Sequence, residues 1–85
     1  MYTVYVLKSI KDKRTYVGCT KDLEKRIKLH NSGQVESTKN RIPFILWYKE
    51  EYADKHEAFS RESHFKTSWG RRQLRKILDN LGTKS

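Results

Sequence analysis

Two residues on one predicted helix carry the first sign of chemistry in this sequence. Arg26 and His30 are four positions apart in the segment 20–33, so on a helix they lie on one face, one turn apart. This spacing sets a permanent positive charge beside an imidazole, which titrates near neutral pH. An Arg and a His at this spacing are also typical of a solvated helix face, so the spacing alone leaves both interpretations open.

Glu62 is unusual because of its position on a second predicted helix, over residues 54–67. Ala58 and Phe65, continued by Trp69, form the apolar stripe of this segment, and Glu62 falls inside that stripe. A carboxylate on the buried side of a helix costs free energy unless it pairs with a cation or binds a metal ion. We therefore expect Glu62 to be either ion-paired with an Arg or Lys or functional.

Two tyrosines bracket the first turn of the chain. Tyr5 and Tyr16 lie in segments of alternating apolar and polar residues on either side of the polar run 11–14, and this pattern predicts a β-hairpin. Tyrosines are common in strands, where their rings pack and pair with cross-strand neighbours. The pattern alone therefore favours a packing role for both rings.

The remaining elements must position these side chains. The helix in 20–33 can be capped by Thr20 or Asp22, and the polar, aperiodic segment 34–41 predicts an exposed loop. Residues 44–52 begin with a continuous apolar run, which predicts a third strand in a central position of the sheet. A third helix is predicted from about residue 70, after the helix over 54–67. The order β-β-α-β-α-α predicts an α+β fold with a small three-stranded, mainly antiparallel sheet flanked by about three helices.

Length and charge limit the organisation and the partners. An 85-residue chain is one domain, which we place at 1–81 with a flexible tail over 82–85. The net charge of +9 and the isoelectric point near 9.9 favour a polyanionic partner, with nucleic acid as the first candidate. A membrane surface is the weaker alternative because the apolar residues are needed for a core. A basic surface that only maintains solubility is the third interpretation.

The cysteine and histidine content argues against disulfide and zinc chemistry. The single cysteine, Cys19, cannot form an internal disulfide, and the chain enters a predicted strand without an apolar signal stretch. We therefore expect a cytoplasmic protein without a membrane span. No CxxC pair or closely spaced histidine pair is present, so a structural zinc site is not expected.

The two tyrosine segments resemble the halves of a known motif. Thr3-Val4-Tyr5 and, after ten further residues, Tyr16-Val17-Gly18 are similar to the GIY-YIG motif of a nuclease superfamily, with Thr and Val replacing the first Gly and Ile. Arg26, His30 and Glu62 fall where that family has its helical arginine, a tyrosine or histidine one turn later, and its metal-binding glutamate. Nearly the whole chain resembles the small stand-alone members of the family.

This resemblance implies a site that cleaves phosphodiester bonds. It implies that the hydroxyls of Tyr5 and Tyr16 face one another across the hairpin, that Glu62 holds Mg²⁺ or Mn²⁺, and that Arg26 grips the phosphate. Among Tyr5, Tyr16 and His30, we favour a tyrosine as the base, with Tyr5 ahead of Tyr16. Neighbouring cations stabilise a phenolate, and they must lower a pKa that is ordinarily near 10.

Two neighbouring positions extend the implied site. Gly18 is expected to let the backbone approach the substrate closely. Cys19 stands where the excision-repair relatives carry a lysine, so one catalytic cation is either absent here or supplied by Lys21.

The implied function is a divalent-metal-dependent endonuclease, acting on branched, flapped or damaged DNA as in DNA repair. The alternative is a nucleic-acid-binding module that keeps the fold without useful turnover. In both cases we expect cationic side chains to bind the DNA backbone. The candidates are Lys39, Arg41, Arg71, Arg72 and Arg75.

Overall fold

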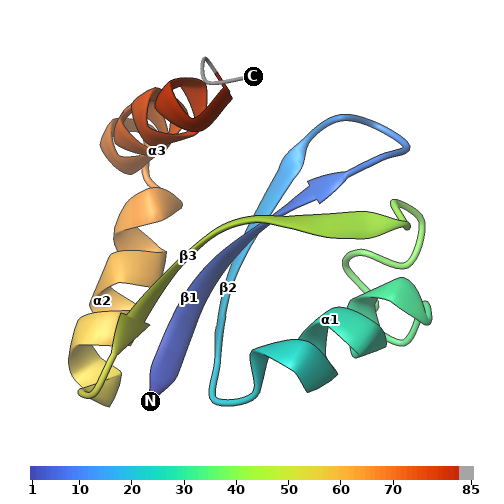
Figure 1. Cartoon of the computed structure of the whole chain (residues 1–85), viewed down its shortest axis with the longest axis horizontal. Helices are drawn as coiled ribbons and strands as arrows, with labels where there is room; N and C mark the ends of the chain where they lie inside the picture. Colours follow the sequence, from blue (N-terminus) through green and yellow to red (C-terminus); the bar gives the residue numbers. More distant parts are fainter. Residues whose placement is uncertain (83–85) are drawn as a thin grey trace.

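Three antiparallel strands form the centre of the molecule in the computed structural model, which describes residues 1–82 (Figure 1). Strands β1 (Tyr2–Ser9) and β2 (Thr15–Thr20) form the expected hairpin, and β3 (Phe44–Tyr52) pairs with the other side of β1. Helix α1 (Leu23–Asn31) follows β2, and α2 (Lys55–Phe65) and α3 (Ser68–Gly82) follow β3. The α+β fold and its element order are confirmed.

The predicted central position of β3 is wrong. The strand order is β2-β1-β3, so β1 is central and β3 lies at an edge. The apolar start of β3 is only partly covered, because Ile45 is 49% exposed and Leu46 is 40% exposed. The pairing of β1 with β3 also shifts register between Val6 and Leu7, opposite this part of β3. A continuous apolar run can therefore belong to an edge strand when a register shift interrupts its alternation.

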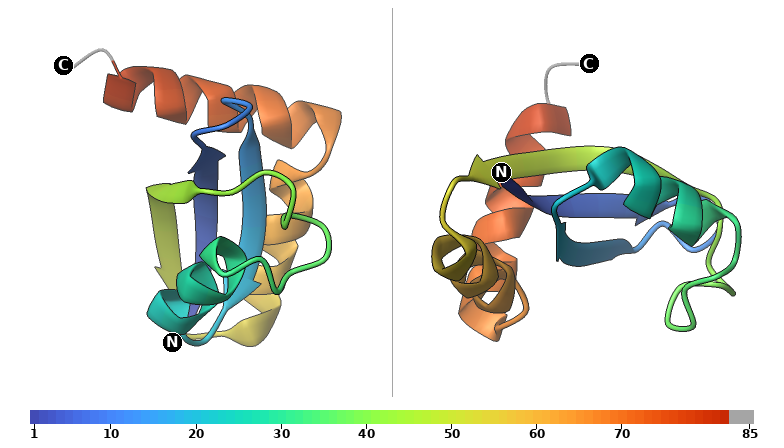
Figure 2. Two further views of the ribbon diagram at one scale, coloured as in Figure 1. Left: turned by 90° about the vertical axis from the view of Figure 1, so that its right-hand side faces the viewer. Right: turned by 90° about the horizontal axis from the view of Figure 1, so that it is seen from below.

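Helices cover both faces of the sheet and create two separate cores. On one face Val4, Val6 and Val17 pack with residues of α2 and α3, including Phe65. On the opposite face Tyr5 and Leu7 pack with Phe44 and with α1. Figure 2 shows α1 on one side of the strands and α2 on the other. Because successive residues of β1 point to opposite covered faces, Thr3 to Leu7 are all buried.

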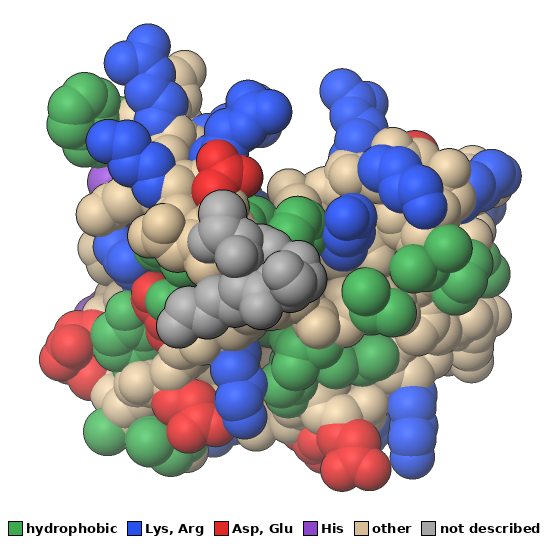
Figure 3. Space-filling model, turned by 45° about the horizontal axis from the view of Figure 1, so that its top comes forward, with side chains coloured by type: hydrophobic (Ala, Val, Ile, Leu, Met, Phe, Trp, Pro, Cys, Tyr) green, Lys and Arg blue, Asp and Glu red, His purple; other side chains and the backbone are tan. Residues whose placement is uncertain are grey.

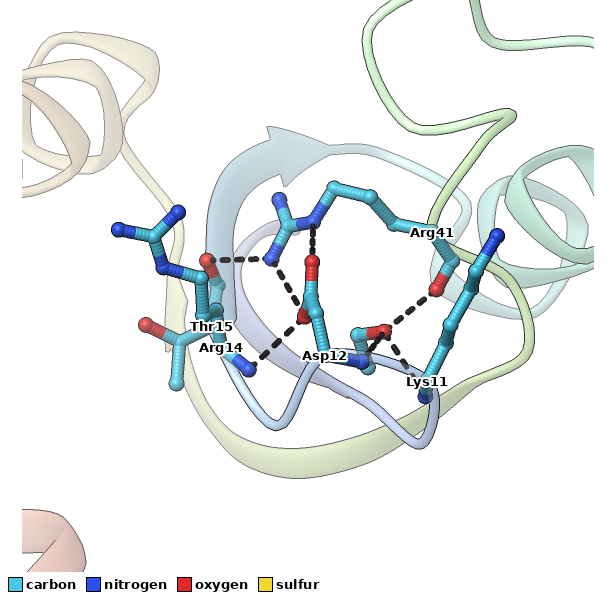
Figure 4. Close-up of polar contacts among 6 residues, drawn as sticks. Lys11, Asp12, Arg14, Thr15 and Arg41 are labelled. Atoms are coloured by element: carbon cyan, nitrogen blue, oxygen red, sulfur yellow. Dashed lines mark hydrogen bonds and ion pairs between the residues drawn. The ribbon is translucent and has the colours of Figure 1, made fainter.

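The hairpin connection is tied to the loop that precedes β3. Arg41 Nε donates to Asp12 Oδ2 at 2.7 Å, and the Arg41 guanidinium also reaches the Thr15 carbonyl oxygen at 3.4 Å (Figure 4). The Ser9 hydroxyl donates to the Arg41 carbonyl oxygen and accepts from backbone N–H groups of the turn. The pKa of Asp12 is lowered to about 2, chiefly by its hydrogen bonds from Arg41 and from the Arg14 backbone. These contacts hold the hairpin tip in one place.

Short polar residues set the helix starts. The Asp22 side chain, rather than Thr20, caps α1 by accepting from the Lys25 backbone N–H at 3.2 Å. Asp54 caps α2 by accepting from the His56 backbone N–H at 2.8 Å, as its position in the sequence predicts. Gly33, just after α1, has a φ of +80°, which glycine adopts without strain.

The break between α2 and α3 differs from the sequence expectation. Helix α2 ends at Phe65, and α3 begins at Ser68, which is slightly before the predicted start. The break changes the helical phase, so Trp69 does not continue the apolar stripe and is 71% exposed. Gly70 is required there because a Cβ would lie 1.6 Å from the His64 carbonyl oxygen.

The C-terminal helix covers the last part of the predicted domain. Leu74 and Leu78 of α3 are buried, whereas Leu81 is 44% exposed. Gly82, the first residue of the predicted tail, is the last residue of α3, and residues 83–85 of that tail lie outside the described residues. None of the helices in residues 1–82 is long and apolar enough to cross a membrane.

Candidate active site

The Tyr5 ring occupies the space above Gly18. These residues are directly opposite one another in the β1–β2 ladder, and Tyr5 is 1% exposed. A Cβ at Gly18 would lie 2.3 Å from the Tyr5 hydroxyl oxygen and 2.4 Å from the ring carbon that carries it. Gly18 therefore makes room for the tyrosine ring. Its expected role of bringing the backbone close to a substrate stays a prediction.

Tyr16 lies beside Tyr5 on the same face of the hairpin, but the two rings are not directly opposite. Tyr16 pairs with Leu7, two positions along β1 from Tyr5. The ring centroids of Tyr5 and Tyr16 are 6.4 Å apart, which fits a diagonal pair. The expectation that the tyrosines face each other across the hairpin is therefore corrected to a diagonal arrangement. Tyr16 is half-buried, whereas Tyr5 is fully buried.

His30 links the Tyr5 hydroxyl to the loop after α1. The imidazole is fully buried, with Nε2 3.0 Å from the Tyr5 hydroxyl and Nδ1 2.8 Å from the Thr38 hydroxyl. The Thr38 hydroxyl also lies 3.5 Å from the Val35 carbonyl oxygen. When Thr38 donates to that oxygen, it accepts from Nδ1–H of His30, and Nε2 then accepts from the Tyr5 O–H. Burial, and then the charge of Arg26, lower the pKa of His30, which favours the neutral imidazole.

Arg26 provides the positive charge on this side of the sheet. Its side chain is half-buried, and its Nε is the one buried side-chain polar atom within residues 1–82 that lacks a hydrogen-bond partner. Burial raises the pKa of Tyr5, while the nearby Arg26 guanidinium acts in the opposite direction and Tyr16 and Glu62 add to the rise. The pKa of Tyr5 therefore lies above its ordinary value, contrary to the expected lowering. Desolvation outweighs the attraction of a single half-buried cation.

Glu62 approaches this cluster from the other side of the sheet. Its side chain is 23% exposed and lies 3.0 Å from Lys66 Nζ, one helical turn later. Its negative charge contributes to the raised pKa of Tyr5 and, after burial, to the raised pKa of Cys19. Cys19 belongs to the edge strand β2, so Glu62 lies near that edge. The expected ion pair is present, and its partner is Lys66.

An ion pair next to Glu62 fixes α2 against the sheet. Arg61 Nε donates to Glu50 Oε1 at 2.8 Å, and the hydroxyls of Tyr48 and Tyr52 also donate to Glu50. Burial alone would raise the pKa of Glu50, but these hydrogen bonds hold it below its ordinary value. Burial and Glu50 raise the pKa of Tyr48 to about 12. Arg61 therefore contacts β3, whereas the next residue, Glu62, acts on Cys19 of β2.

Lys66 and Thr38 are the site residues that the sequence interpretation missed. Lys66 Nζ lies 6.0 Å from the centroid of the Tyr16 ring as well as 3.0 Å from Glu62. Lys21, the expected replacement cation, instead lies over Tyr2 at 5.3 Å from the ring centroid. The i,i+4 spacing of Glu62 and Lys66 is a sequence signal for their pairing. Thr38 has no comparable signal, because it lies in an aperiodic loop.

The structure brings the five expected catalytic residues into one region. The ring centroids of Tyr16 and His30 are 5.0 Å apart, and Tyr5 contacts both rings. Arg26 and Glu62 act electrostatically on Tyr5 from different helices. These residues come from β1, β2, α1 and α2, so no single element explains their proximity.

The donor set limits the kind of metal ion that this region can hold. Within residues 1–82 no group of three or more His, Cys, Asp or Glu side chains could surround a metal ion. Glu62 offers one partly exposed carboxylate. Mg²⁺ commonly uses one or two carboxylates, keeps several waters and takes substrate phosphate oxygens as further ligands. The residues present therefore fit Mg²⁺ or Mn²⁺ held together with substrate, and they do not fit a closed zinc site.

Within residues 1–82, the expected substrate-binding cations divide into those that form an ion pair and those that do not. Lys39 pairs with Glu36 at 3.1 Å, and Arg41 pairs with Asp12 at 2.7 Å. Arg71 and Arg75 line a groove between the hairpin and α3, whereas Arg72 is exposed on α3 and does not line that groove. The predicted set is therefore spread over several surfaces, and none of its members lies in the tyrosine and histidine cluster.

The chain is similar to known proteins over nearly its whole length. The model of the GIY-YIG catalytic domain matches residues 1–75. A UPF0213 protein of Bacillus pumilus is 46% identical over 78 residues, covering 91% of this chain and 78% of the relative. A UPF0213 protein of Clostridium perfringens is 48% identical over 67 residues, covering 78% of this chain and 71% of the relative.

A solved structure supports the same similarity at the level of the fold. The solution NMR structure of a UPF0213 protein from Bacillus halodurans is 34% identical, with a TM-score of 0.56. The match covers 91% of this chain and 85% of that protein. Sequence and fold therefore lead to one family.

Proposed function

Because the chain belongs to the GIY-YIG family of nuclease domains, we propose that it is a divalent-metal-dependent endonuclease that hydrolyses DNA. The observation that carries this proposal is the cluster in which the Tyr5 hydroxyl contacts His30 beside the buried Arg26 Nε. The net charge of +9 supports a polyanionic substrate. Branched, flapped or damaged DNA is the proposed substrate class, as in DNA repair.

Tyr5 and His30 supply the proposed path for a proton. In the resting protein Tyr5 keeps its proton and donates it to His30 Nε2, at 3.0 Å between heavy atoms. As the Tyr5 oxygen accepts a proton from the attacking water, its own proton passes to Nε2. Thr38 supports this transfer because it holds the Nδ1–H tautomer. The base is then Tyr5 acting with His30, and Tyr16 lines the same site.

Arg26 supplies the proposed contact to the scissile phosphate. A guanidinium presents several N–H donors in a planar fork, which matches two oxygens of a phosphate group. The buried Nε without a partner leaves one of these donors available. A phosphate oxygen that accepts from Arg26 would satisfy this donor and balance the charge that develops during hydrolysis.

Glu62 is the proposed metal ligand. A bound Mg²⁺ or Mn²⁺ would polarise the scissile phosphate and neutralise charge on its oxygens. Lys66 Nζ lies 3.0 Å from Glu62 Oε2, so Glu62 Oε1 is the oxygen that would hold such an ion. The Lys66 ammonium also lies 6.0 Å from the centroid of the Tyr16 ring, where it would contact a neighbouring phosphate.

The test is a cleavage screen with labelled duplex, flap, splayed-arm and four-way-junction DNA in Mg²⁺ and in Mn²⁺. We expect cleavage of at least one branched DNA, complete loss with EDTA, and loss in Glu62→Ala. Glu57→Ala is the matched control because Glu57 is an exposed carboxylate on the same helix. Activity that persists in Glu62→Ala contradicts the role of Glu62.

The alternative proposal is a nucleic-acid-binding module with little turnover. The Glu62–Lys66 ion pair is the observation that favours it, because Lys66 competes with a metal ion for the Glu62 carboxylate. Tight binding of every DNA in the screen without cleavage in either metal would support this alternative.

A further inference from the structure

A groove separates the β1–β2 hairpin from helix α3, next to the tyrosine and histidine cluster. It has a volume of about 950 Å³, within the range of about 300–1,000 Å³ typical of ligand pockets. One wall is the hairpin, and the other is formed by α3 and the end of α2. Figure 3 shows a notch between two raised parts of the surface, with Lys and Arg side chains on both.

The walls of this groove are strongly cationic. Its lining includes six Lys or Arg and two Asp residues, which leaves a net charge of +4. The hairpin wall carries Lys13 and Arg14, and the α3 wall carries Arg71 and Arg75. These four side chains form no ion pair within the described part of the chain. Their charges are therefore available to a polyanion that lies between the walls.

The floor of the groove is apolar and partly aromatic. Val17, Leu74 and Leu78 line it together with Tyr16 and Trp47, which are both half-buried. A duplex presents phosphates on its outside and keeps its bases stacked inside. An unpaired strand can place its phosphates against cationic walls and its bases against an apolar or aromatic floor. This combination fits a single strand better than a duplex.

The groove is continuous with the candidate active site. Tyr16 and Lys66 line the groove, and both belong to the cluster around His30 and Glu62. A strand with its scissile phosphate at that cluster would therefore enter the groove through these two residues. We propose that the groove between the hairpin and α3 binds an unpaired strand of the nucleic acid substrate, next to the scissile phosphate. This inference rests on the proposed function, and it restricts the substrate to DNA with a single-stranded segment.

The first test is binding measured by fluorescence anisotropy in EDTA, where no cleavage occurs. The probes are a labelled deoxyoligonucleotide of about 15 nucleotides and its duplex with the complement. We expect the single strand to bind at least about tenfold more tightly than the duplex, because only the single strand can use the apolar floor. Equal affinity, or tighter binding of the duplex, would overturn the inference.

The second test compares two neighbouring cations on α3. Arg75 lines the groove, whereas Lys76 is exposed and does not. Arg75→Glu should weaken binding of the single strand about tenfold, and Lys76→Glu should change it by less than about threefold. Equal losses in both variants would show that binding depends on diffuse charge, and the groove assignment would then fail.

The third test separates stacking from charge. Trp47→Leu keeps an apolar floor but removes the aromatic surface, so we expect weaker binding of the single strand and unchanged binding of the duplex. Thermal melting shows whether this variant is folded. If it is not, the comparison of Arg75→Glu with Lys76→Glu tests the groove assignment instead.

Cleavage is measured separately on the same DNAs with Mg²⁺. Cleavage of fully paired DNA without preference for a single strand would overturn the inference and keep the nuclease function. Tight binding of the single strand without any cleavage would keep the groove assignment and contradict the nuclease function.

Discussion

The Tyr5 ring fills the volume that any side chain at Gly18 would need. A Cβ at Gly18 would lie 2.3 Å from the Tyr5 hydroxyl oxygen, which is far inside van der Waals contact. The two residues are cross-strand partners in β1 and β2. The glycine therefore sets the position of the proposed catalytic hydroxyl.

Gly18→Ala should destabilise the protein and displace Tyr5. We expect the free energy of unfolding to fall by about 1–3 kcal/mol, because an added methyl group overpacks a buried site. Chemical denaturation measures the loss. Lys49→Ala is the control, since Lys49 is exposed and pairs with Tyr5 on the other side of β1, and its effect should stay within about 0.5 kcal/mol. Unchanged stability in Gly18→Ala would show that Tyr5 moves aside without cost.

Thr38→Val should impair the proposed proton path without touching Tyr5. The variant keeps the shape of the side chain but leaves the buried Nδ1–H of His30 without an acceptor, at a cost of about 1–3 kcal/mol. The imidazole can then change tautomer and cease to accept from Tyr5. Nitrogen NMR shifts of His30 report the tautomer, and single-turnover cleavage reports the rate. Thr38→Ser keeps the hydroxyl and should restore both, whereas a wild-type spectrum in Thr38→Val would contradict the assignment.

The titration of His30 should link activity and stability to acid pH. Burial and Arg26 lower its pKa below the ordinary value of about 6.5, so the folded protein binds this proton less readily than the unfolded chain. The free energy of unfolding should therefore fall as the pH decreases from about 6.5 through the pKa of the folded state. The single-turnover rate should fall in the same range because a protonated imidazole cannot accept from Tyr5. Proton NMR of the imidazole measures the pKa, and Arg26→Leu should raise it. A pKa above 6.5 in the wild-type protein would contradict this prediction.

The local patterns in the sequence predict more of the molecule than the contacts between distant elements. The hairpin and the three helices follow from alternation, capping residues and apolar spacing, which are local properties. The edge position of β3 was missed because a register shift and the placement of α1 decide which strand is central. The same applies to Gly18, whose contact with Tyr5 depends on strand register.

The site could be predicted in part for the same reason. The positions of Tyr5, Arg26 and Glu62 relative to a family motif suggest a common site, and the structure brings them into one region. The raised pKa of Tyr5 could not be anticipated, because it depends on the burial that the sequence does not give. Thr38 was missed because a loop without periodicity gives no indication of where its side chains point.

The identity of the base should follow from three variants compared across a pH series. Tyr5→Phe removes the hydroxyl that contacts His30, and we expect the largest loss of single-turnover cleavage from this variant and from His30→Ala. Tyr16→Phe should have a smaller effect, because within the described residues its hydroxyl has no hydrogen bond to His30. Near wild-type rates in both Phe variants, with an inactive His30→Ala, would assign the base to His30 and contradict the role of Tyr5.

Arg26→Ala should separate cleavage from binding. The guanidinium is the proposed donor to the scissile phosphate, and loss of one such donor typically lowers a rate by about 10²–10³. Binding depends on many cations, so its affinity should change little and should decrease steeply with salt as counterions are released. Arg26→Lys should stay impaired because an ammonium cannot form the planar fork, although it keeps the charge. Lys28→Ala is the matched control, since Lys28 lies on the same helix and pairs only at 4.0 Å with the exposed Glu24. An Arg26→Lys variant with the wild-type rate would show that the positive charge alone is sufficient for cleavage. Equal losses of binding and cleavage in Arg26→Ala would show that Arg26 contributes to DNA binding in general.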